Sequence, residues 1–278
     1  MMSPALIPVL KRLVRISRYN SSMWKGDYAD WATVKRQCDG YESGDILQKC
    51  REALHKVKAG EAQYERDSLL FNDTRLCWEL LAAALKTASE QGRLSVLDFG
   101  GALGSLYFQH RTWLNQVPNL RWHVVEQENF VQAGRAEAED GRLRFFHSIE
   151  DSQASDKANL ILLSGVIQVM EDPYAWIRRF NALPEVAYIV LDRVPIIKDG
   201  RTKDMLTRQT VAPHIYQASY PSWFFHEPNF LKAFDRYEMV AEYQSRFDWN
   251  QWVNGLRCTW KGYVLAPKPA VRQSSSLF

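Results

Sequence analysis

The sequence lacks most of the features that would place a chain in a simple class. Its 278 residues include four cysteines, with no CxxC pair and no Cys/His ligand spacing, so we expect no metal site and no disulfide framework. This use of cysteine favours a reducing cytoplasm. A net charge of +3 argues against a nucleic-acid binder, which would carry a clustered basic face. No apolar run approaches the ~20 residues that span a bilayer.

The chain does hold enough apolar residues for a full core. At 46% hydrophobic composition over this length, it predicts one large domain with an appendage. Residues 1–92 combine aromatic-rich turns with long helical patterns, which predict a helical N-terminal appendage. Residues 93–267 form the expected main domain, with an aromatic-rich insertion at about 198–228. Residues 268–278 are polar and predict a flexible tail.

The first twenty residues have two interpretations. Leucine and isoleucine recur there at helical spacing with lysine and arginine between them, but the basic residues follow the apolar run, which is the wrong order for a secretory signal. A basic amphipathic helix of this kind can lie on an anionic membrane surface. The alternative is a terminal helix that packs on its own protein or stays partly disordered. The chain is therefore expected in the cytoplasm, with peripheral contact to the inner membrane face left open.

Short apolar runs separated by helical segments begin at residue 94. The runs are LSVLDF, RWHVVEQ, LRFFHS, ANLILLS and AYIVLDRV. Strand followed by helix, repeated, predicts a parallel sheet with helices on both faces. Two late segments, EMVAEYQSRF and CTWKGYVLAP, predict a hairpin at the sheet edge. We therefore expect an α/β fold with a seven-stranded, mostly parallel sheet whose last strand is antiparallel.

A glycine-rich turn follows the first of these strands. The strand ends at Asp98, and Gly100, Gly101 and Gly104 lead into the next helix. Glycine suits such a turn because it takes unusual backbone dihedrals and lets a ligand approach the main chain closely. Ligands of open parallel sheets bind beyond the carboxyl ends of the strands, where this turn lies. A purely structural turn is the alternative.

The spacing of the glycines narrows the choice of ligand. A GxGxxG nicotinamide fingerprint fails because Ala102 and Ser105 stand in place of its second and third glycines, and the GK[ST] ending of a phosphate-binding P-loop is absent. An acidic residue followed by glycines two, three and six positions later resembles the first motif of class I S-adenosylmethionine (SAM)-dependent methyltransferases, usually written [DE]xGxGxG. Ala102 departs from that motif, and Gly101 is expected to share the role of its middle glycine.

Other strand ends supply the remaining residues expected to contact the cofactor. Glu126 ends the second strand, where a carboxylate can accept hydrogen bonds from vicinal ribose hydroxyls, although a solvated surface glutamate is the plainer alternative. The third and fourth strand ends are expected to border the adenine and the sulfonium, respectively. Their residues are Ser148 and Ile149 with His147 beside them, and Ser164 with Gln168.

Longer segments extend the resemblance over most of the chain. LSGVIQVMEDPY, DRVP and ASYPSWFF are similar to segments of a family of bacterial methyltransferases that are often associated with cell-surface polysaccharide genes. The resemblance implies a Rossmann-like class I methyltransferase fold and methyl transfer from SAM, and it leaves the acceptor open. We interpret the chain as an enzyme that O-methylates a sugar, a glycan precursor or another small molecule.

The acceptor side is expected at the fifth strand end and in the insertion. Asp192 is the first candidate for orienting or deprotonating an acceptor hydroxyl, with His214 and His226 as alternative bases. Arg193 is expected either to contact the substrate or to neutralise Asp192. Aromatic residues of the insertion predict an acceptor-facing wall or, alternatively, a hydrophobic cover over the sheet edge. They are Tyr216, Tyr220, Trp223 and Phe224.

Two other classes of function stay open. A nicotinamide-dependent oxidoreductase or epimerase is disfavoured by the failed GxGxxG and by the absence of a YxxxK pair. A non-catalytic binding module would keep Asp98, the glycines and Glu126 without turnover. The sequence predicts neither the methylated atom nor the oligomeric state.

Overall fold

The computed structural model describes residues 23–40, 44–73, 75–198, 200–212, 215, 217–245 and 251–269. The amphipathic helix expected in residues 1–20 and most of the expected C-terminal tail lie outside these ranges, as do His214 and Tyr216. Within the described ranges, no helix combines the length and the apolar character that crossing a membrane requires.

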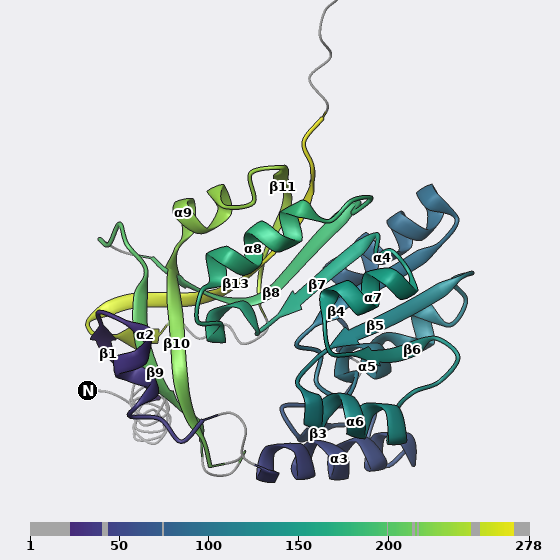
Figure 1. Ribbon diagram of the computed structural model, residues 1–278, viewed down its shortest axis with the longest axis horizontal. Helices are drawn as coiled ribbons and strands as arrows, with labels where there is room; N and C mark the ends of the chain where they lie inside the picture. Colours follow the sequence, from purple (N-terminus) through teal and green to yellow (C-terminus); the bar gives the residue numbers. More distant parts are fainter. Residues whose placement is uncertain are drawn as a thin grey trace, which may run out of the picture.

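Seven strands form the sheet that the sequence predicts. Five of them run parallel in the order β6-β5-β4-β7-β8. A sixth strand, β13, runs antiparallel to β8, and β11 pairs with the far edge of β13. In chain order the seven strands are β4 (Leu94–Phe99), β5 (Leu120–Val125), β6 (Leu143–Phe146), β7 (Leu160–Ser164), β8 (Tyr188–Ile197), β11 (Tyr237–Gln244) and β13 (Leu256–Pro267). The expected mostly parallel α/β sheet with an antiparallel last strand is confirmed (Figure 1).

Two apolar layers cover the sheet because alternate residues of its buried strands point to opposite faces. Val96 of β4 packs in one hydrophobic cluster and its neighbour Leu97 in the other. The first cluster includes residues of the helices α3 (Gly44–Lys58), α4 (Trp78–Gln91), α5 (Ser105–Leu114) and α6 (Glu128–Glu137). The second cluster includes residues of α7 (Ile149–Ser155), the 3₁₀ turn η1 (Ile167–Val169), α8 (Pro173–Ala182) and α9 (Glu227–Lys232).

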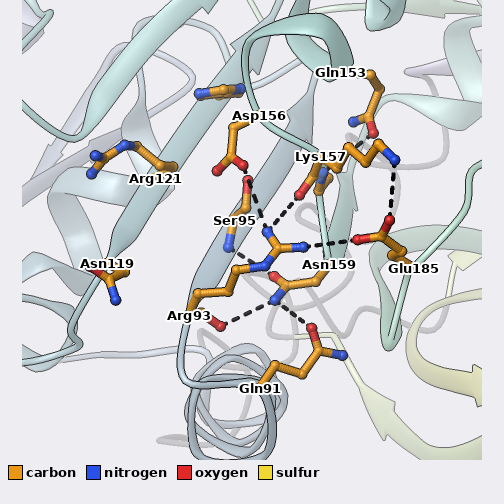
Figure 2. A network of polar contacts seen from close by, with 12 residues as sticks. Gln91, Arg93, Ser95, Asn119, Arg121, Gln153, Asp156, Lys157, Asn159 and Glu185 are labelled. Atoms are coloured by element: carbon orange, nitrogen blue, oxygen red, sulfur yellow. Dashed lines mark hydrogen bonds and ion pairs between the residues drawn. The ribbon is translucent and has the colours of Figure 1, made fainter.

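The amino ends of β4 and β7 are joined by a polar network (Figure 2). The Asn159 side chain accepts a hydrogen bond from the Ser95 backbone N–H at 2.8 Å and donates to the Arg93 carbonyl at 3.1 Å. The Arg93 guanidinium donates to the Lys157 carbonyl at 2.8 Å and pairs with Glu185 at 3.3 Å. This network fixes the amino edge of the sheet. The glycine-rich turn lies at the opposite, carboxyl edge, and that edge is the one where a ligand can bind.

The expected insertion is a pair of strands rather than a helix or a loop. Strand β9 (Met205–Thr210) pairs antiparallel with β10 (Ser219–His226), and the end of β10 pairs with Ile196 and Ile197 of β8. On its other edge β9 pairs with β1 (Trp24–Tyr28), which comes from the N-terminal region. We call β1, β9 and β10 the antiparallel extension; it lies to the left of the parallel strands in Figure 1.

The N-terminal region contains helices, as expected, and also strands. Besides α3 it holds the short helix α2 (Trp31–Lys35) and a hairpin of β2 (Tyr64–Arg66) and β3 (Leu69–Phe71). Together with β1, β9, β10 and β12 (Gln251–Val253), the main sheet reaches eleven strands among the described residues, where the sequence predicted seven. Strand β1 pairs with β9 across most of the chain length and β12 has three residues, so local periodicity does not reveal the partners of these strands.

Strand β8 contains a bulge at its centre. Leu191 faces Tyr263 and Val194 faces Lys261, so Asp192 and Arg193 together oppose one residue of β13. Arg193 takes a left-handed conformation with φ of 58°. Bulges of this kind redirect side chains and are frequent beside active sites.

Candidate functional site

A cavity of about 910 Å³ opens at the carboxyl ends of β4, β5 and β7. The order of the strands reverses between β4 and β7, and such a switch point is where ligands bind in open α/β sheets. Most of the residues that the sequence assigned to the cofactor line this cavity. They are Asp98, Gly100, Gly101, Glu126, Ser148, Ile149 and Ser164, with His147 beside them.

The glycine-rich turn forms one wall of the cavity and is closely packed from behind. A Cβ on Gly101 would lie 2.5 Å from the Asp98 carboxyl group, and one on Gly100 would collide with the Val166 side chain. Ala102, which replaces a glycine of the motif, takes a left-handed conformation with φ of 50°. The backbone therefore has a glycine-like shape at this position even though the residue is alanine.

Gly104 does not line the cavity and instead has a structural role. It starts α5 with φ of 87°, and a Cβ there would lie 2.9 Å from Leu143. Gly104 therefore lets the helix begin close to β6, although the sequence placed it among the residues in contact with the cofactor.

Asp98 lies beneath the turn and is fully buried. The indole N–H of Trp122 donates a hydrogen bond to its carboxyl group at 3.0 Å. Burial, opposed by that hydrogen bond, raises the pKa of Asp98 to about 7. This carboxyl group thus supports the turn from inside the protein and titrates near neutral pH.

Glu126 faces the turn from the end of β5. Its carboxylate accepts hydrogen bonds from the backbone N–H of Ala102 at 3.3 Å and from that of Gln127 at 2.8 Å. Burial raises the pKa of Glu126, while these two bonds oppose the shift. A carboxylate offers about four lone-pair positions, so acceptor capacity remains on the cavity side.

The β2–β3 hairpin brings three charged residues to the site that the sequence analysis did not assign. Glu65, Arg66 and Asp67 line the cavity, and Asp67 and Ser68 form a two-residue turn with φ of 50° and 66°. Left-handed residues at both turn positions are typical of a tight hairpin. An Asp-Ser pair directly before the apolar run Leu69–Phe71 was the available signal, but nothing local connects the hairpin tip to a cavity at the sheet edge.

Glu65 is buried, and its carboxyl group accepts hydrogen bonds from the Ser105 hydroxyl and, at 3.1 Å, from the Ser68 backbone N–H. Burial raises its pKa to about 7, against the opposing effect of the Ser105 hydrogen bond. Its neighbour Arg66 donates to the Gln109 side chain at 3.1 Å. The hairpin tip is thereby attached to the first turns of α5, directly after the glycine-rich turn.

Arg193 connects the hairpin tip to the end of β7. Its guanidinium forms an ion pair with Asp67 at 3.0 Å and donates to the Ser164 carbonyl at 3.1 Å. The side chain lies so close to Gly165 that a Cβ on that glycine would come within 2.8 Å of the guanidinium carbon. The sequence analysis offered Arg193 as a substrate contact or as the partner of Asp192, and the structure shows Asp67 as its ion-pair partner.

Asp192, the first candidate base, lies outside the lining of this cavity. Its carboxylate is 9% exposed and accepts a hydrogen bond from the Ser164 hydroxyl at 3.1 Å. His226 likewise lies apart, at the end of β10, where its backbone N–H donates to Asp204 at 2.7 Å. His214 is outside the described residues. The structure therefore brings none of the three expected bases to the cavity wall among the residues it describes.

The aromatic residues of the insertion divide between the two faces of β10. Tyr220 lines the cavity, whereas Phe224 packs against both Trp24 and Trp260. Trp223 points to the other face, stacks on Trp31 and donates to the Met170 carbonyl at 3.1 Å. Tyr220 therefore lies where an acceptor-facing wall would place it. Phe224 instead packs as part of a hydrophobic cover.

A smaller cavity of about 250 Å³ adjoins the first one. Gln168, expected at the sulfonium end of the cofactor, lines this second cavity instead. Among the described residues, no group of three or more histidine, cysteine, aspartate or glutamate side chains is arranged to hold a metal ion.

Comparison with known proteins gives matches among solved structures alone. No family model matches the chain, and no curated protein matches it. The N-terminal domain of EvdMO1 with SAH bound is 12% identical and covers 78% of this chain and 97% of its own, with a TM-score of 0.48. The CcbJ methyltransferase from Streptomyces caelestis is also 12% identical, covering 67% and 88%, with a TM-score of 0.41. A SAM-dependent methyltransferase from Methanosarcina mazei is 11% identical, covering 64% and 93%, with a TM-score of 0.42. Likeness at this level carries no argument about activity, which we infer from the cavities.

Proposed function

We propose that the chain binds SAM in the larger cavity and transfers its methyl group to a hydroxyl of a small polar acceptor, such as a sugar or a glycan precursor. The observation that carries the proposal is the Glu126 carboxylate, which faces the backbone of the glycine-rich turn beside the switch point of the sheet. The proposal includes a cytoplasmic enzyme of polysaccharide biosynthesis, as the resemblance of the sequence implies.

The residues of the larger cavity suit the parts of SAM. Glu126 keeps lone pairs for the two ribose hydroxyls, and the buried side chain of Ile149 offers an apolar surface for the adenine. The Glu65 carboxyl group and the Arg66 guanidinium follow one another at the end of β2, and these two groups suit the ammonium and carboxylate groups of an amino acid. The cavity volume of about 910 Å³ is within the usual range for small-molecule sites.

The chemistry asks little of the protein besides positioning. Bound SAM supplies an electrophilic methyl group: the acceptor oxygen forms a bond to the methyl carbon, the carbon–sulfur bond breaks with its electron pair remaining on sulfur, and the hydroxyl proton passes to a base. Rigid placement of the acceptor contributes much of the rate in such a displacement. The protein has to hold the hydroxyl and accept its proton.

Asp67 is the carboxylate best placed for that task. It lines both cavities, and its ion pair with Arg193 fixes its position. A carboxylate so held can orient an acceptor hydroxyl even when its basicity is too low for full proton removal in advance. Asp192 is expected to act through Ser164 and Arg193 rather than by contact with the acceptor.

Calorimetric titration of the purified chain with SAM, SAH and NAD tests the cofactor. We expect SAM and SAH to bind at micromolar concentrations and NAD not to bind, whereas tight binding of NAD alone would favour the oxidoreductase alternative. Radiolabelled methyl transfer to a pooled extract of polar metabolites and glycans then tests turnover. Binding of SAM without transfer to any fraction would favour the non-catalytic module.

A further inference from the structure

The second cavity has no part in the proposed binding of SAM, yet it adjoins the larger cavity. Asp67, Gly165, Val169, Arg193 and Tyr220 line both cavities. The two spaces therefore meet at the Asp67–Arg193 ion pair, beside the carboxyl end of β7. A molecule in the second cavity would lie next to the end of the larger cavity that we assign to the methyl group.

The antiparallel extension gives this cavity an aromatic wall. Trp24 of β1 lies opposite Gln209 of β9, which lies opposite Tyr220 of β10, so the three residues form a row across the strands. Trp260 adds a second indole, with its ring centroid 5.1 Å from that of Trp24. The two indoles are mostly buried, but together with the phenol ring they line the cavity with apolar aromatic surface against which the C–H groups of a ring can pack.

Uncharged polar side chains line the cavity beside the aromatic residues. They are Gln168, Gln209, Ser222 and Gln251. Amide and hydroxyl groups of this kind can both donate and accept hydrogen bonds. A ligand that also donates and accepts hydrogen bonds suits such a lining.

The charges at the cavity favour a neutral ligand. Among the described residues that line it, two side chains are charged, Asp67 and Arg193. They form an ion pair with each other at 3.0 Å, and Arg193 also donates to the Ser164 carbonyl at 3.1 Å. A carboxylate or phosphate would have to compete with Asp67 for the guanidinium, and an ammonium would have to compete with Arg193 for the carboxylate. A neutral molecule meets no such competition.

We propose that the second cavity is the acceptor site, which rests on the proposed methyltransferase function, and that it takes a neutral, saturated ring carrying several hydroxyl groups. Hydroxyl groups both donate to and accept from the amide and hydroxyl groups of the four polar side chains that line the cavity. The C–H faces of the ring pack against Trp24 and Trp260. A planar phenol offers too few hydroxyl groups for these four side chains.

The test measures binding of small probes to the full chain saturated with SAH. Binding is detected by saturation-transfer NMR and quantified by calorimetry. The probes are the methyl glycosides of glucose, galactose, mannose and rhamnose, with cyclohexanol and catechol as rings that carry fewer hydroxyl groups. We expect at least one glycoside to bind at least ~10-fold more tightly than cyclohexanol and catechol. Binding of none of the glycosides, or equal binding of catechol, would overturn the proposal.

Variants locate the site. Gln251→Leu and Ser222→Ala should each weaken the bound glycoside by about 10-fold while leaving SAH affinity unchanged, since each removes one hydrogen-bonding group. Gln132→Leu, an exposed position on α6, is the matched control and should leave both affinities unchanged. If Gln251→Leu does not fold, Gln209→Leu on the opposite wall takes its place. Unchanged glycoside affinity in the folded variants would place the acceptor elsewhere.

The experiment separates this proposal from the proposed function. Each probe is also titrated without SAH, and SAH is titrated alone. If SAH does not bind, the methyltransferase proposal fails. Glycoside binding that depends on Gln251 and Ser222 would still show that the second cavity binds a polyhydroxylated ring. If SAH binds and the glycosides do not, the acceptor proposal alone fails.

Discussion

Asp67 and Arg193 lie 126 positions apart in the chain and form an ion pair of 3.0 Å. One stands in the tight turn of a hairpin and the other in the bulge of a central strand, and both have positive φ angles. Left-handed backbone costs a non-glycine residue about 1–2 kcal/mol, so two such residues in contact suggest a geometry that function maintains. The pair stands where the two cavities meet, and replacing it should affect chemistry more than cofactor binding.

Asp67→Asn keeps the shape of the side chain and removes its charge. We expect turnover of a methyl acceptor to fall by roughly 10²-fold, the usual size of a lost general base, and SAH affinity to stay within about threefold. Asp192→Asn is the comparison, and its effect on turnover should be smaller because Asp192 lines neither cavity. A larger loss in Asp192→Asn, in a folded protein with normal SAH affinity, would restore Asp192 as the base.

Glu126→Gln tests the proposed ribose contact. The amide keeps one acceptor oxygen but loses the charge, so SAH binding should weaken by about 1–2 kcal/mol, or roughly tenfold, in calorimetry. Glu61→Gln serves as the control, since Glu61 is exposed and lines neither cavity. Equal affinities in the two variants would mean that the ribose does not contact Glu126.

Gly101→Ala should damage the turn, because its Cβ would lie 2.5 Å from the Asp98 carboxyl group. We expect a loss of about 1–3 kcal/mol in the free energy of unfolding, measured with urea, and a loss of SAH binding. At Gly141 a Cβ would meet no atom within 4 Å, so Gly141→Ala should change neither quantity appreciably. If Gly101→Ala were as stable as wild type, the turn would have accommodated the added methyl group without loss of free energy of unfolding.

Glu65 should give the fold a distinctive pH dependence. Its pKa in the folded protein, about 7, lies above its usual value of 4.5, so the folded state holds the proton more tightly than the unfolded chain does. The stability gained in this way is fully present below about pH 4.5 and is lost as the pH rises through 7. Glu65→Gln stays neutral throughout. The melting temperature of the variant, compared with wild type from pH 5 to 8.5, should therefore fall less steeply with pH. Parallel curves would show that Glu65 does not titrate in this window.

The sequence predicted the parallel sheet and the strand-end residues that line the larger cavity because both depend on local patterns. Apolar runs and a glycine-rich turn lie within a few residues of one another, and parallel strands bring their carboxyl ends to one edge regardless of what the rest of the chain does. Asp98, Gly101 and Glu126 could thus be placed together without any knowledge of distant contacts. Ala102 illustrates the limit of the motif, since its left-handed backbone is visible in the structure alone.

The hairpin tip and the second cavity depend on contacts that no local pattern encodes. Glu65 reaches Ser105, Asp67 reaches Arg193, and Trp24 lies beside Gln209 only because separate parts of the chain meet around the sheet edge. The bulge at Arg193 likewise follows from the register between β8 and β13, which alternation along one strand does not reveal. The acceptor side therefore could not be assigned from sequence. The expectation for Asp192 rested on its place at the predicted end of the fifth strand, whereas β8 continues to Ile197.

The pairing of β1 with β9 has a consequence for the order in which the protein forms. β1 is the first described strand to leave the ribosome, but its partner β9 follows about 180 residues later and Trp260, which contacts Trp24, later still. Contacts between residues so far apart close slowly, because the intervening chain must be ordered first. The parallel strands can therefore assemble into a cofactor cleft before the aromatic wall closes beside them. In pulsed hydrogen exchange during refolding, amides of Leu94–Phe99 should gain protection before those of Trp24–Tyr28, so that competence to bind SAH precedes competence to bind an acceptor.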